Sequence, residues 1–78
     1  MDDIKLLEAN DAYAFEHAKW GMRFNKAFSP GRHEVYRADS NGDPLVKAWS
    51  EDSDAAINEY EEMRAIASMK AAVKIVNG

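Results

Sequence analysis

The chain has 78 residues, 46% hydrophobic and 31% charged, and its 14 acidic and 10 basic side chains leave a net charge of −4. This length fits one folded domain, residues 1–78, and excludes most enzyme architectures. Without cysteine there are no disulfides or thiolate metal sites. No stretch approaches the roughly 20 apolar residues of a membrane span, and residues 1–5 are acidic where a secretory signal is basic, so we expect a cytoplasmic protein with no membrane partner.

The charges are segregated along the sequence. Residues 1–16 hold five carboxylates against one lysine (−4), and residues 17–37 hold five basic side chains against one glutamate (+4). Residues 38–62 hold eight carboxylates against one lysine (−7), and residues 63–78 hold three basic side chains (+3). The small net charge therefore conceals opposing patches.

The first predicted element is an amphipathic helix over residues 4–24. Asn10 and Asp11 can each cap a new helix, so the segment is either one helix or two. Residues 29–31, Ser-Pro-Gly, end it because proline disfavours helix in the residue before it. The apolar side chains at helical spacing are Ile4, Leu7, Ala14, Ala18 and Met22, flanked by Tyr13, Trp20 and Phe24.

A β-hairpin follows, with strands predicted at residues 32–38 and 45–49. The connection over residues 39–44 contains Asn41-Gly42, a pair that tolerates the positive φ angles of a tight turn. Its alternating oxygen side chains resemble the start of a calcium loop, but the sixth and twelfth positions lack the required glycine and glutamate. A hairpin turn is therefore the expected structure.

The last predicted element is a helix that starts at Ser50 or Ser53, where a hydroxyl can cap free N–H groups. Either the helix runs to about residue 76 and is buried more broadly at its end, or it ends near Met69 and residues 72–76 form a third strand. We favour the helix because alanine is the best helix former and no turn residue interrupts the segment. Two apolar stripes follow the helix, one of Ala56, Tyr60, Met63 and Ala67, and one of Ile66, Met69, Val73 and Val76.

These elements predict a small α+β domain in the order α-β-β-α, with two helices packed on the hairpin. A two-stranded hairpin is marginal alone, so the helices must supply most of the core or a dimer must extend the sheet.

No motif points to catalysis or to a cofactor. His17 and His33 have no metal-ligand partner at helical or strand spacing, and the four glycines are too far apart to form a phosphate-binding loop. We therefore expect a protein that is not an enzyme and has no catalytic residue, metal site or cofactor.

The basic segment gives one functional hypothesis. Three of its basic residues are spaced by four and three, which would align them on one helix face, and two follow on the adjoining strand with Trp20 nearby. Such a stripe could contact phosphates, so a small nucleic-acid-binding regulator is an alternative function. Its residues are Lys19, Arg23, Lys26, Arg32 and Arg37.

The acidic segment gives the leading hypothesis. Its carboxylates exceed what a helix dipole requires, and a surface of spaced negative charges can imitate a phosphate backbone and occupy the basic groove of a nucleic-acid-binding protein. Trp49 borders this region as a candidate interface anchor. The predicted protein-binding residues are Asp39, Asp43, Trp49, Glu51, Asp54, Glu59 and Glu62.

The predicted function is thus that of a small acidic interaction protein whose partner has a basic surface. A very small, cysteine-free, acidic α-β-β-α chain resembles phage-encoded inhibitors of host proteins, including some anti-CRISPR proteins. That resemblance implies an inhibitor of a host nucleic-acid-processing protein. A further alternative is a dimerising scaffold whose hairpin edge pairs across a two-fold axis.

Overall fold

The structure, a computed structural model, describes the backbone of residues 2–77 and the side chains of residues 8–75 and 77. The predicted apolar positions Ile4, Leu7 and Val76 lie outside the described side chains. The chain forms α1 (Asp2–Ala18), β1 (Trp20–Asn25), β2 (Arg32–Ala38), β3 (Pro44–Ser50) and α2 (Ser53–Asn77). The three strands form one antiparallel sheet in the order β1-β2-β3. The predicted α+β class is confirmed.

The N-terminal segment differs from its prediction in its second half. One uninterrupted helix passes through Asn10 and ends at Ala18, and β1 then replaces the predicted helical residues up to Phe24. Gly21 lies directly across from Tyr36 on β2, and the Tyr36 ring occupies the space that a side chain at Gly21 would need. Glycine disfavours helix by about 1 kcal/mol relative to alanine, and the close cross-strand contact requires it here.

The predicted hairpin is confirmed as β2 and β3. Gly42 has a φ of 85°, which a side chain would disfavour, while no other described residue of the turn has a positive φ. The Asp39 carboxylate accepts backbone hydrogen bonds from Asn41 at 2.8 Å and Asp43 at 3.0 Å. Asp39 therefore has a structural role inside the turn.

The C-terminal helix is continuous to Asn77, so the alternative of a third strand at residues 72–76 is wrong. It starts at Ser53, and its cap is Asp52, whose carboxylate accepts a hydrogen bond from the Ala55 N–H at 3.0 Å. Ala56 is buried and the other residues of the first predicted stripe are half-buried. Ile66, Met69 and Val73 of the second stripe are exposed, which contradicts broader burial over this part of the helix.

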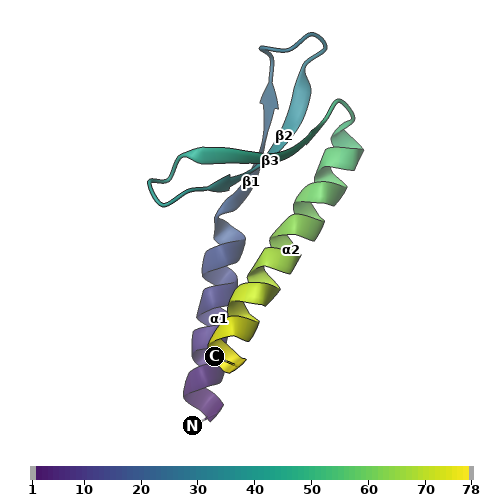
Figure 1. Ribbon diagram of the computed structural model, residues 1–78. Coiled ribbons are helices and arrows are strands. Elements are labelled where there is room, and N and C mark those ends of the chain that lie inside the picture. Colours follow the sequence, from purple (N-terminus) through teal and green to yellow (C-terminus); the bar gives the residue numbers. More distant parts are fainter. Residues whose placement is uncertain (1, 78) are drawn as a thin grey trace.

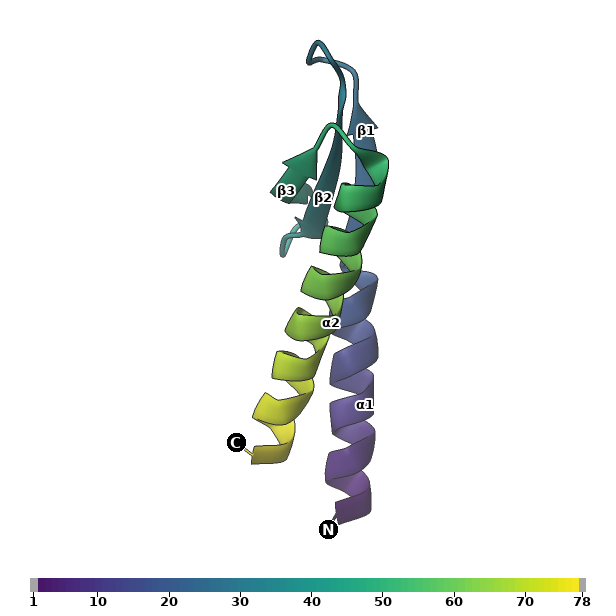
Figure 2. The same ribbon diagram turned by 90° about the vertical axis from the view of Figure 1, so that its right-hand side faces the viewer.

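The elements make an elongated molecule (Figures 1 and 2). α2 begins on one face of the sheet and then runs beside α1, so that the two helices extend away from the strands as a pair. α1 approaches the sheet only where it leads into β1. The overall extents are 54 × 26 × 14 Å. Val35 of β2 and Ala56 of α2 are the buried contact between sheet and helix, which leaves the other sheet face uncovered by any described helix.

Candidate functional site

A buried carboxylate organises the open face of the sheet. Arg23 of β1, Glu34 of β2 and Trp49 of β3 lie directly across from one another and so share one face. Glu34 is 1% exposed, and its two carboxylate oxygens accept hydrogen bonds from Arg23 Nε and Arg32 Nε, each at 2.9 Å. Asn25 adds longer bonds of 3.4 Å to both oxygens. Donation from Arg23 lowers the pKa of the Glu34 carboxyl, against burial, which raises it.

Aromatic rings hold one of these guanidinium groups in place. The Arg32 guanidinium lies 3.6 Å from the centre of the Phe28 ring and 4.7 Å from the centre of the Trp49 ring. Both rings are partly exposed, Phe28 at 44% and Trp49 at 55%. The Arg32 guanidinium is therefore held by a carboxylate at its edge and by aromatic rings at its faces.

A second ion pair joins α1 to the sheet. Arg37 donates from Nε to Glu16 Oε1 at 2.6 Å and from Nη2 to Glu16 Oε2 at 2.9 Å, and Lys19 Nζ lies 3.7 Å from Glu16 Oε2. The hydrogen bond from Arg37 lowers the pKa of Glu16, while the same bond raises the pKa of Arg37. This pair stabilises the position of the α1 end against β2.

The predicted basic helix face is wrong, because its residues do not lie on one helix. Lys19 follows α1, Arg23 lies on β1 and Lys26 lies in the β1–β2 loop, so helical spacing does not apply to them. Four of the five predicted residues form ion pairs with Glu16 or Glu34 inside the domain. Those two carboxylates hold all four side chains in place and offset half of their positive charge. The sequence analysis missed the role of Glu34. It is the single carboxylate in the basic segment and lies two residues after Arg32, a position that allows it to pair with the basic side chains around it.

The predicted acidic residues are divided between two places. Asp39 and Asp43 lie in the β2–β3 turn, whereas the others lie in the loop before α2 and on its first turns. The seven residues of β3 separate the two places by about 20 Å. We call the second group the acidic collar, and it consists of Glu51, Asp54, Glu59 and Glu62.

The acidic collar is exposed and carries unbalanced charge. Glu59 is half-buried and the other three members are exposed. Among the described side chains, no basic group forms an ion pair with the collar, and the nearby Arg64 pairs instead with Glu61 at 3.1 Å. Glu59 lines a small cavity of about 200 Å³ between β3 and α2, whereas the exposed Trp49 ring lies on the open face of the sheet beside Arg32.

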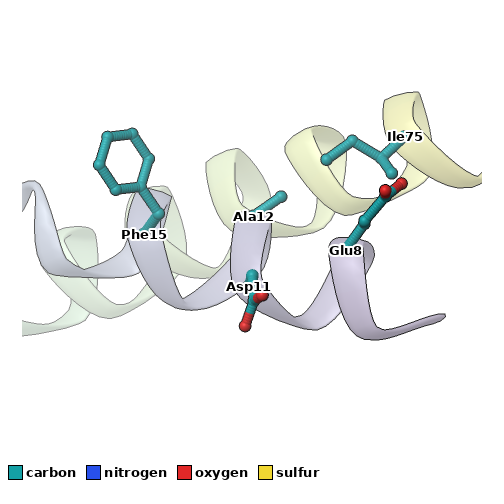
Figure 3. A pocket seen from close by; sticks show the side chains of 5 residues that line it. All are labelled: Glu8, Asp11, Ala12, Phe15 and Ile75. Atoms are coloured by element: carbon teal, nitrogen blue, oxygen red, sulfur yellow. The ribbon is translucent and has the colours of Figure 1, made fainter. Parts of the chain in front are cut away.

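A shallow hollow also lies between the helices, beside the exposed Phe15 (Figure 3). It has a volume of about 540 Å³ and is lined by residues of α1 and by Ile75 of α2. Glu8 points towards Ile75, whereas Asp11 points away from it. One carboxylate beside apolar side chains provides no nucleophile with a base to activate it.

The histidines make aromatic contacts. His17 stacks on Tyr13 with ring centres 5.3 Å apart, and the His33 ring lies 4.8 Å from that of Phe24. Within the part of the chain that the structure describes, no three His, Asp or Glu side chains come together as a metal site. These contacts give the two rings a packing role.

No helix in the described residues has the length and apolar character needed to cross a membrane. Comparison with protein-family models, with curated proteins and with solved structures gives no match to this chain. The functional interpretation therefore depends on the geometry and charge of the sheet face and the acidic collar.

Proposed function

We propose that this chain is a small non-enzymatic interaction protein that binds the basic, nucleic-acid-binding surface of a cytoplasmic protein through its acidic collar. The observation that carries the proposal is the unequal pairing of its charges. Four of the five basic residues of segment 17–37 are held by Glu16 and Glu34, whereas the collar carboxylates form no ion pair among the described side chains.

Unpaired surface charge supports recognition for a physical reason. An exposed carboxylate keeps its electrostatic field in solution, which raises the rate of encounter with a basic partner and disfavours acidic ones. Carboxylates that occupy a basic groove take the place of phosphates, so such a protein would inhibit nucleic-acid binding by its partner. The exposed Trp49 on the open sheet face is the kind of aromatic side chain that anchors interfaces.

The experiment captures partners from the heparin-binding protein fraction of the native cells on the immobilised chain. The test variant is Glu51→Lys/Asp54→Lys, and the matched control is Glu8→Lys/Asp11→Lys on α1, which changes the net charge by the same amount. We expect the wild type and the control to retain the same nucleic-acid-binding protein, DNA to compete with it, and the test variant to lose it.

Retention by the test variant at the level of the control would contradict the proposal, as would capture that DNA does not reduce. Circular dichroism of each variant checks that α2 is intact, since a lysine at Asp54 opposes the helix dipole by about 0.3–1 kcal/mol.

A further inference from the structure

The outer face of α2 exposes three large apolar side chains. Ile66, Met69 and Val73 are 46%, 58% and 52% exposed. With Lys70 and Lys74 they line a groove of about 430 Å³. Spacings of three and four residues align the three apolar side chains along one side of the helix.

In the part of the chain whose side chains are described, neither α1 nor the sheet covers this stripe. Ser68, which is completely buried, marks the side of α2 that packs against the rest of the protein. Successive helical residues are rotated by 100°, so Ile66 and Val73 lie on the far side of the helix from Ser68. A contiguous row of exposed apolar side chains of this kind marks an interaction surface.

The dimensions of the monomer also indicate an interaction surface, because the chain is less compact than a domain of its length. Its radius of gyration is 14.9 Å, against about 11.5 Å for a compact domain of this length. Its accessible surface is 5501 Å², against about 4,800 Å² for a compact protein of its mass. The only described hydrophobic side chains that are buried are Ala9, Val35 and Ala56, so the single chain leaves much of its apolar surface in water.

The charges beside the stripe identify its occupant. Glu62 and Lys70 lie four residues before and after Ile66, while Glu59 and Lys74 lie seven before and eight after. An antiparallel copy of α2, related by a two-fold axis near Ile66, places each glutamate beside a lysine of the other copy. A parallel copy places like charges together, which is destabilising.

We propose that this face of α2 binds a second copy of the chain, with the two α2 helices antiparallel about a two-fold axis near Ile66. The axis lies close to the middle of α2, so nearly all of its 25 residues, about 37 Å, overlap. The contact is isologous and closes on itself, which limits the assembly to a dimer. This interface is on the helices and differs from the hairpin-edge pairing expected from the sequence.

Sedimentation equilibrium of the full chain tests the interface. We expect the wild type to sediment as a dimer at high concentration and Met69→Glu, which puts a charge in the apolar contact, to raise the dissociation constant at least about tenfold. Because Met69 is exposed in the monomer, this variant should keep the wild-type circular dichroism spectrum. A wild type that remains monomeric up to about millimolar concentration, or a dimer that Met69→Glu leaves unchanged, would overturn the proposal.

Charge exchange tests the direction of pairing. Lys70→Glu/Lys74→Glu and Glu59→Lys/Glu62→Lys should each weaken the dimer at low salt, and mixing the two variants should restore association as a heterodimer. The control Glu8→Lys/Asp11→Lys should leave it unchanged. If neither charge variant weakens the dimer, the antiparallel arrangement is wrong.

In the dimer, Glu59 and Glu62 of the acidic collar face lysines of the other copy, which leaves Glu51 and Asp54 for a basic partner. The two proposals are therefore tested by different variants. Glu51→Lys/Asp54→Lys lies outside the stripe and should preserve the dimer, whereas Met69→Glu leaves the carboxylates at Glu51 and Asp54 in place.

Discussion

The open sheet face and the outer face of α2 use charged residues in opposite ways. On the sheet, Glu34 is buried by the two arginines that bind it, so charge replaces an apolar cover. On α2, carboxylates and lysines remain exposed beside an apolar stripe. The comparison shows that a count of charges along the sequence does not reveal which of them reach a partner. Whether a charged side chain can contact a partner depends on which residues it pairs with across the strands. Substitutions in the two regions should therefore have different effects.

The largest expected effect comes from removing the carboxylate of the sheet face. Glu34→Ala leaves Arg23 and Arg32 without their shared partner, and we expect it to lower the free energy of unfolding by about 3 kcal/mol. Arg23→Ala should cost less, about 1 kcal/mol, because that side chain is 43% exposed. Urea denaturation at a fixed protein concentration measures both. Equal losses in the two variants would contradict the central position of Glu34.

Breaking the link between α1 and β2 should have an intermediate effect. Arg37→Ala removes a bidentate pair with Glu16 whose arginine is 31% exposed, and we expect a loss of about 1–2 kcal/mol. A double-mutant cycle with Glu16→Gln isolates the pair, since the two losses should not add. Additive losses would show that the contact does not stabilise the fold.

Acid should weaken the fold through the same carboxylates. The pKa values of Glu16 and Glu34 in the folded protein lie below the ordinary value of 4.5. Their contribution to the free energy of unfolding is therefore fully present above about pH 4.5. It is lost as the pH falls from there through the lowered pKa values. The free energy of unfolding of Glu34→Gln, measured between pH 7 and pH 3, should fall less steeply than that of the wild type. Parallel curves would contradict this assignment.

The smallest expected effect is a gain in the free energy of unfolding, and it concerns the contact between the two helices. Ser68 is completely buried and its hydroxyl has no hydrogen-bond partner among the described residues. Ser68→Ala removes that unsatisfied group and improves helix propensity, so we expect a gain of about 0.5–1 kcal/mol by thermal or urea denaturation. A loss of stability would show that the hydroxyl has a partner.

The sequence predicted the elements whose signals are local. The Asn41-Gly42 turn and the uninterrupted alanine-rich segment of α2 are such signals, and both elements are confirmed. β1 was missed because its apolar residues also fit a helical period, and only pairing with β2 makes it a strand.

The candidate site was predictable only in part for the same reason. The sequence singled out the collar carboxylates, but it grouped them with Asp39 and Asp43, which β3 holds at a distance. It also aligned Arg23 with Lys19 on a helix, although Arg23 lies on β1 directly across from Glu34 on the neighbouring strand β2. Contacts between residues distant in the chain decide which charges are exposed.

The central claim is that Glu16 and Glu34 hold four of the five basic side chains of segment 17–37 inside the domain, whereas the collar carboxylates form no ion pair among the described side chains and can bind a partner. A fluorescence titration against single-stranded and duplex DNA and RNA at about 100 mM salt tests it most directly. We expect no binding at micromolar protein, even though Arg23, Arg32 and Lys26 lie at or near the β1–β2 loop. Binding that weakens steeply with salt and is lost in Arg23→Ala/Lys26→Ala would contradict it.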